Sequence, residues 1–333
     1  MKSKSFIVVV FSIAFGASAS FAQNSSSAPK PIQPYAGPKV SEIILKNLGQ
    51  GQQKLEISRE QREQAYAKLL EGQRYIWMSQ HTRSQAAKMQ NARLASQALQ
   101  KAVELNPTLS EAYTALAELT KNTPPFDITV VDESITLAEI AVKIQPNNFG
   151  GHQILAQLYT YKSNLNRGIL DPIFTQKAIK EWREIARLDS RNAEAHAFLS
   201  EFYARTKKND ERISALKNWL ASAPPLGNGF YGRVFQAESL SPETASIKLG
   251  AALIETGQTA QAVEILSRAV ADEPSNTEVV ELLLEALETA DANTSAKAVQ
   301  ALQQALYSNP ENPKLIAALA QIKARTEKPA PKQ

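Results

Sequence analysis

Small and large apolar residues recur along the chain with a spacing that predicts amphipathic helices. A small residue is followed by a large one four positions later, a small one three positions further, and a proline five beyond. The pattern occurs as Ala95, Leu99, Ala102 and Pro107, again as Ala262, Leu266, Ala269 and Pro274, and again as Ala298, Leu302, Ala305 and Pro310. Residues at i, i+4 and i+7 share one face of an α-helix, and the proline marks its end. Because the pattern repeats, we expect an array of stacked units rather than one globular core.

The stretch 243–276 is the cleanest unit and contains two such helices. Its first helix begins after Ser241-Pro242 and ends at Gly257, and its second runs from about 259 to 272. If Glu243 is position 1 of the unit, a small residue stands at position 8 (Gly250) and another at position 20 (Ala262). Small residues there let the two helices approach closely, since bulk would force them apart.

This arrangement resembles the tetratricopeptide repeat (TPR) family, and the resemblance covers most of residues 60–325. The family places a large residue at position 4, Leu at 7, a small residue at 8 and an aromatic residue at 11. Units that start at 110, 149, 193 and 277 match several of these positions together, with Tyr113, His152, His196 and Val280 at position 4. Gly72 and Tyr75 correspond to positions 8 and 11 of a divergent first unit. The resemblance implies an all-α, right-handed superhelical solenoid of helix–turn–helix repeats.

The first residues have the features of an export signal. Lys2 and Lys4 precede an apolar run over 6–15, and Ser20 and Ala22 stand where a signal peptidase would cut. The run is shorter than the roughly 20 residues that span a bilayer. We therefore expect a bacterial protein exported to the periplasm or cell envelope, with cleavage before Gln23 and no stable membrane insertion afterwards.

Breaks in the repeat spacing divide the rest of the chain. Extra residues fall near 123–126, within 161–176 and within 225–240, and insertions in repeat proteins often lie on a binding face. The predicted organisation is a signal peptide (1–22), a Pro/Ser-rich tether and lead-in (23–59), an N-terminal array of about four irregular units (60–224), a connector (225–242), C-terminal units with a capping helix (243–326), and a disordered tail (327–333).

Few residues suit catalysis or cofactor binding. The chain has no Cys and three His, which excludes disulfides, zinc–thiolate sites and thiol nucleophiles. His152 and His196 stand at position 4, where the family has a core residue, and His81 lies in a polar stretch. We predict a protein that is not an enzyme and has no cofactor and no metal. Two alternatives stay open: an accessory domain of an enzyme with a site in the insertions, and a structural component of the cell envelope.

Protein binding has better support in the sequence. The net charge of +4 falls to +2 without residues 1–22, and no basic cluster is interleaved with aromatic residues, which argues against nucleic acid as a ligand. In TPR proteins, positions 2, 5, 9, 12 and 13 of the first helix tend to face a concave groove. The resemblance therefore implies a groove, acidic in tendency, that accepts a polar or basic protein segment and is lined by Glu111, Glu118, Lys121, Asn122, Gln153, Gln157, Tyr161, Glu194, Glu201 and Arg205.

Overall fold

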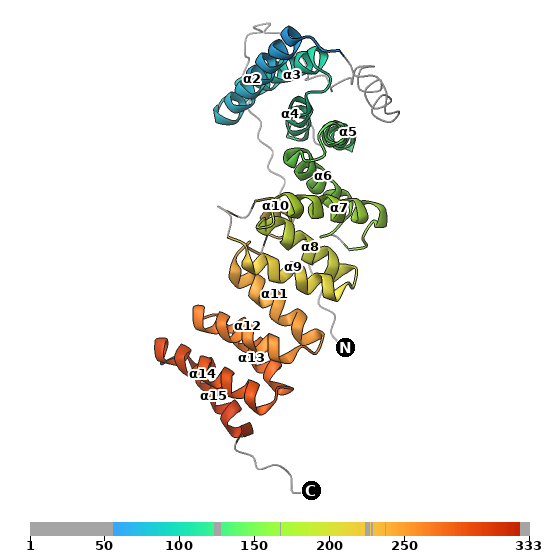
Figure 1. The fold of residues 1–333 in the computed structure, drawn as a ribbon. Coiled ribbons are helices and arrows are strands. Elements are labelled where there is room, and N and C mark those ends of the chain that lie inside the picture. Colours follow the sequence, from blue (N-terminus) through green and yellow to red (C-terminus); the bar gives the residue numbers. More distant parts are fainter. Residues whose placement is uncertain are drawn as a thin grey trace, which may run out of the picture.

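The structure is a computed structural model that describes residues 56–122, 128–166, 168–223, 227, 229–236 and 238–326. These residues form α-helices and connecting turns, without a β-strand among them (Figure 1). The predicted signal peptide, most of the tether and the tail lie outside the described residues. The helices are α2 (Arg59–His81), α3 (Gln85–Leu105), α4 (Ser110–Lys121), α5 (Ile128–Ile144), α6 (Phe149–Lys162), α7 (Pro172–Leu188), α8 (Ala193–Arg205), α9 (Asn209–Ala221), α10 (Gly229–Val234), α11 (Pro242–Glu255), α12 (Thr259–Asp272), α13 (Thr277–Glu288), α14 (Ala292–Ser308) and α15 (Pro313–Thr326).

The helices pack as consecutive pairs that stack into an elongated array. The pairs are α2/α3, α4/α5, α6/α7, α8/α9 and α11/α12; α13 and α14 both pack mainly against α12, and α15 packs against α13 and α14 at the end. Within the array, helices contact their own partner and the helices of the next unit (Figure 1). The predicted class, an all-α solenoid of helix pairs, is confirmed. Helix α10 belongs to no pair and packs against α8.

Two glycines show why the repeat requires small residues at position 8. A Cβ added to Gly72 would lie 2.6 Å from Cγ of Leu99, and one added to Gly250 would lie 2.5 Å from Cδ2 of Leu266. Both leucines are completely buried, so neither has room to move aside. The same contact therefore joins the two helices near either end of the array, as the spacing predicts.

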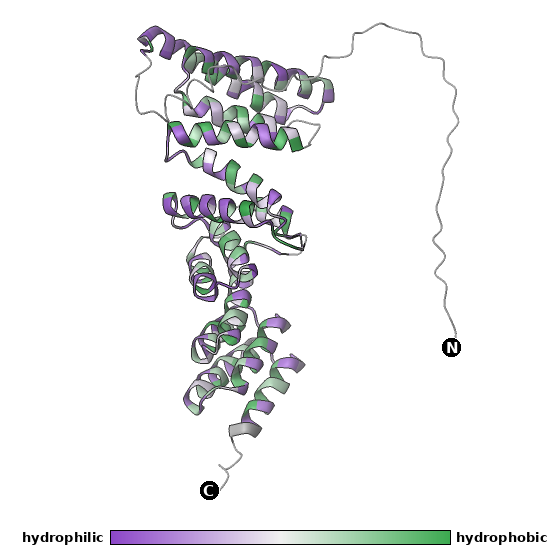
Figure 2. Ribbon diagram, turned by 90° about the vertical axis from the view of Figure 1, so that its right-hand side faces the viewer, coloured by the Kyte–Doolittle hydropathy of each residue, from purple (hydrophilic) through white to green (hydrophobic). Residues whose placement is uncertain are grey.

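Most of the helices bury apolar residues against their neighbours. Hydrophilic and hydrophobic residues alternate along the ribbons (Figure 2). Asparagines cap the first helices of two central units: Asn148 Oδ1 accepts from the Gly151 N–H at 2.8 Å, and Asn192 Oδ1 accepts from that of Ala195 at 2.9 Å. The core is aromatic in the middle of the array. Phe198 stacks on Trp182 with ring centroids 4.5 Å apart and lies 5.3 Å from Tyr231 of α10.

Candidate functional site

The predicted groove residues of α4 and α6 lie side by side on the first helices of two consecutive units. Lys121 Nζ donates to Oε1 of Gln157 across the two helices at 2.9 Å, and it pairs with Glu118 Oε2 at 2.7 Å. Asn122 donates to the other oxygen of Glu118 at 2.7 Å. These bonds join four of the ten predicted residues into one polar strip.

Three more predicted residues lie on the same two helices. Glu111, near the start of α4, is exposed, and Gln153 on α6 is half-buried. Tyr161 keeps 52% of its surface exposed at the end of α6. Gln157 is buried and is therefore reached from outside only through its neighbours. The α4–α6 face thus offers carboxylates, amides and one aromatic ring to a partner.

Glu194 on α8 is used within the chain as a helix cap. Its Oε1 accepts from the backbone N–H of Phe230 at 2.6 Å and from that of Tyr231 at 2.9 Å, at the start of α10. Burial raises the pKa of this carboxyl, although the two N–H groups and the nearby Arg233 and Lys121 oppose the shift. Sequence reasoning placed Glu194 in the groove, and the structure shows that α10 covers that part.

Glu201, about two turns further along α8, also contacts the inserted segment. Its carboxylate lies 2.9 Å from Lys248 Nζ of α11 and accepts from the Tyr231 hydroxyl at 3.3 Å. Glu238 binds the same two groups, at 3.0 Å from Lys248 Nζ and 2.6 Å from the Tyr231 oxygen. Burial works to lower the pKa of Lys248, but the two carboxylates outweigh it and raise that pKa. This network fastens α10 between α8 and α11.

Arg205, the last predicted residue, binds the other insertion. Its guanidinium donates to the carbonyl of Leu165 at 3.0 Å and also to that of Gly168, in the connection between α6 and α7. Asn166 in that connection reaches the carbonyl of Val234 in α10 at 3.5 Å. The two longest departures from the repeat spacing therefore meet beside α8. One sequence signal for this packing is the three aromatic residues of the segment 225–240. Because they follow no periodic pattern, the sequence does not show which helix they contact.

The two position-4 histidines are buried, as predicted for core residues, and each Nε2 bonds a backbone carbonyl at 2.9 Å: Pro146 for His152 and Ser190 for His196. His152 Nδ1 also lies 2.6 Å from Glu181 Oε2. A neutral imidazole donates from one nitrogen only, so two acceptors favour the imidazolium. Burial alone would lower the pKa of His152, but Glu181 and the Pro146 carbonyl raise it overall.

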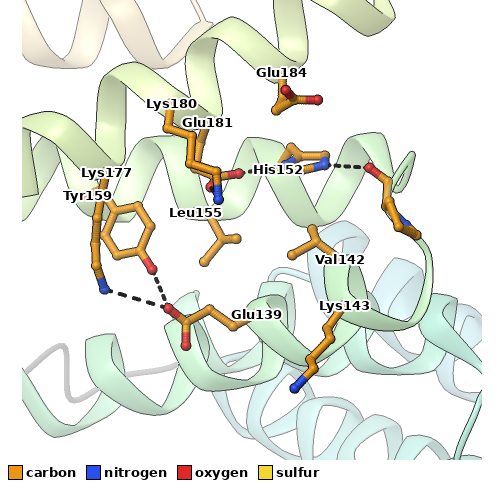
Figure 3. Close-up of a pocket in the computed structure, with 11 residues that line it drawn as sticks. Glu139, Val142, Lys143, His152, Leu155, Tyr159, Lys177, Lys180, Glu181 and Glu184 are labelled. Atoms are coloured by element: carbon orange, nitrogen blue, oxygen red, sulfur yellow. Dashed lines mark hydrogen bonds and ion pairs between the residues drawn. The ribbon is translucent and has the colours of Figure 1, made fainter. Parts of the chain in front are cut away.

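His152 and Glu181 line a cleft between α5, α6 and α7 (Figure 3). The cleft has a volume of about 440 Å³, and Glu139, Lys177 and Tyr159 close one side of it. The Tyr159 hydroxyl donates to Glu139 Oε1 at 2.6 Å, and Lys177 Nζ lies 3.8 Å from the same oxygen. Each carboxylate that lines the cleft has a basic partner: Glu139 pairs with Lys177, Glu181 with His152 and Lys180, and Glu184 with Arg187.

In the part of the chain that the structure describes, no cluster of three or more His, Asp or Glu side chains is arranged to hold a metal ion. No helix among the described residues is both long enough and apolar enough to cross a bilayer.

The protein is an all-α helical-repeat solenoid built from helix pairs with small residues at their crossings. Its unit positions and their packing resemble those of tetratricopeptide repeats. No protein-family model matches the sequence, and no curated protein sequence matches it.

Solved structures with a similar fold include several TPR proteins. YrrB, a TPR protein with an unusual peptide-binding site, is 12% identical, with 67% of this chain and 98% of that one covered and a TM-score of 0.40. TTC0263, a thermophilic TPR protein of Thermus thermophilus, is 18% identical, with 65% and 99% covered and a TM-score of 0.33. PilF of Pseudomonas aeruginosa is 12% identical, with 80% and 100% covered and a TM-score of 0.37.

Proposed function

We propose that this protein is an exported adaptor or scaffold that binds a segment of a partner protein along the first helices α4 and α6. The observation that carries the proposal is the contrast along the groove face. On α8 the side chains at positions 2, 9 and 13 are Glu194, Glu201 and Arg205. Each of them binds either α10 or the α6–α7 connection of the same chain. On α4 the equivalent carboxylates, Glu111 and Glu118, face outward, with Glu111 exposed.

The charge of this face supports a polar or basic segment as the ligand. Lys121 is paired with Glu118 and Gln157 and balances one carboxylate. With Glu111 as the second carboxylate, the strip carries a net negative charge. Tyr161 adds an exposed ring that suits an aliphatic or cationic side chain. The role is binding rather than catalysis, since both buried histidines hold backbone carbonyls.

Partner capture followed by matched charge reversals tests this proposal. Affinity purification from the cell-envelope fraction, with mass spectrometry, supplies the partner, and its affinity is then measured against salt for two double variants. E111K/E118K is expected to weaken binding about tenfold or more and to flatten the salt dependence, because rim charges act through long-range attraction.

The matched control is E278K/E285K, which makes the same charge change at exposed positions of α13. It is expected to leave the affinity within about twofold, as distant surface charges do. Equal affinity for all three proteins, or a loss confined to the α13 variant, would overturn the proposed location. E194K/E201K is unsuitable here because it would displace α10 as well.

Export is the second part of the proposal and rests on Lys2, Lys4 and the apolar run 6–15. N-terminal sequencing of the protein from the envelope fraction tests it. A start at Gln23 is expected; a start at Met1 in that fraction would favour the anchored envelope component, and recovery only from the cytoplasm would refute export.

A further inference from the structure

Helix α2 carries an exposed apolar stripe, on which the one ring contact among the described residues is the His81 ring of the same helix, stacked on Trp77 with centroids 4.3 Å apart. Tyr66, Leu70 and Trp77 are 49%, 62% and 59% exposed. At 100° per residue their directions fall within about 40° of one another. The helix buries a different side, with Ala65 and Leu69, against the array. Three large apolar side chains in one row are more than scattered surface residues, and such a row marks a docking surface.

The position numbers place this stripe at the N-terminal end of the groove. With Gly72 at position 8 of the first unit, Tyr66 stands at position 2 and Trp77 at position 13, which are groove positions in the later units. In those units the same positions carry Glu111 and Asn122, or Glu194 and Arg205. The first unit therefore carries large aromatic residues at two positions where the units starting at 110 and 193 carry polar ones.

The chain itself holds a segment that matches the stripe, and we propose that residues 40–48 dock on it. Val40, Ile44 and Leu48 recur at the i, i+4 and i+8 spacing of one helix face, with Glu42 and Lys46 on the opposite side. The segment lies outside the described residues. Eight helical steps span about 12 Å, close to the roughly 16 Å from Tyr66 to Trp77.

The connection between the segment and α2 has the right length and a defined end. Residues 49–58 include Gly49 and Gly51, and ten such residues have a root-mean-square span of about 17 Å. Ser58 fixes where α2 begins: its Oγ accepts from the Gln61 N–H at 3.1 Å, and Gln61 returns a bond to the Ser58 N–H at 2.9 Å. The chain can therefore reverse and place residues 40–48 antiparallel to α2.

A tethered segment has the advantage of concentration over any free partner. A tether of about ten residues gives an effective concentration in the millimolar range, so even weak apolar contact keeps the segment bound for much of the time.

Trp77 reports the docking without any label. The chain has three tryptophans, and Trp182 and Trp219 are 1% and 2% exposed, so acrylamide quenching in the folded protein reports mainly Trp77. The experiment compares the purified chain with the I44D/L48D variant. The quenching constant is expected to rise about twofold in the variant, because an indole released from an apolar contact becomes open to solvent.

Two controls separate docking from other causes. K46D changes the net charge by the same amount as I44D/L48D but on the polar side of the segment, and it is expected to quench like the parent chain. In a W77F background, I44D/L48D is expected to have no effect. Quenching of the parent chain is also expected to stay constant on hundredfold dilution, since the contact is intramolecular.

The results that overturn the proposal are distinct. Equal quenching of parent and I44D/L48D means that residues 40–48 do not cover Trp77. If dilution removes the protection of Trp77 from quenching, the stripe binds a second copy of the chain instead. If the quenching constant rises in K46D as much as in I44D/L48D, the effect comes from the change in charge and not from loss of docking.

Discussion

Helices α4 and α8 carry glutamates at the same two unit positions but use them differently. Glu111 and Glu118 stand at positions 2 and 9 of one unit, and Glu194 and Glu201 stand at positions 2 and 9 of another. Glu111 is exposed, whereas Glu194 accepts two backbone N–H groups from α10 and Glu201 joins the network around Lys248. A repeat position therefore fixes where a side chain points, and the insertions decide what it meets.

The largest effect that tests this difference comes from Tyr231, the buried anchor of α10. Y231A is expected to destabilise the protein by about 3–5 kcal/mol, because it empties a packed site between Phe198 and Trp219 and removes the hydroxyl that donates to Glu201 and Glu238. Chemical unfolding followed by circular dichroism measures the change. Y161A, which removes an exposed ring, should stay within about 0.5 kcal/mol. Equal losses for the two variants would mean that α10 adds nothing to stability.

A smaller effect is expected from the cap on α10. E194A removes the acceptor of two backbone N–H groups and should cost about 0.5–2 kcal/mol, as lost N-caps do. E194Q keeps an acceptor oxygen and should restore most of the loss, and E111A at the same unit position should be neutral. Hydrogen exchange at the Phe230 and Tyr231 amides provides the site-specific measurement. Unchanged exchange in E194A would show that the cap is not formed.

The buried pair of His152 and Glu181 makes the stability of the fold depend on pH. The pKa of His152 is raised above its ordinary value, so its pairing with Glu181 stabilises the fold most below the ordinary histidine pKa of about 6.5. That contribution is lost as the pH rises through the higher folded-state pKa. The free energy of unfolding, measured from pH 5 to 9, should therefore fall less steeply in H152Q than in the parent chain. A slope in H152Q equal to that of the parent chain would show that His152 is not the titrating group.

The sequence was sufficient to predict the framework, since small and large residues such as Gly250 and Leu266 occupy unit positions that must touch. It also predicted which side chains of α4 and α6 share a face, as the bond from Lys121 to Gln157 shows. It did not predict that Glu194 is covered, because Phe230 and Tyr231 lie in an aperiodic stretch and reach α8 only through tertiary packing. Glu181 was missed for a similar reason: its partner His152 is 29 residues away and on another helix.

Thiol labelling can show directly whether position 2 is open on α4 and covered on α8, because the chain contains no cysteine of its own. Single variants E111C and E194C place a reporter at position 2 of the α4 and α8 units, and each is labelled with and without the co-purified partner. We expect E111C to react several times faster than E194C. The partner should slow the labelling of E111C and leave the labelling rate of E194C unchanged. Equal rates in the free protein, or an E111C rate that the partner does not alter, would contradict this expectation.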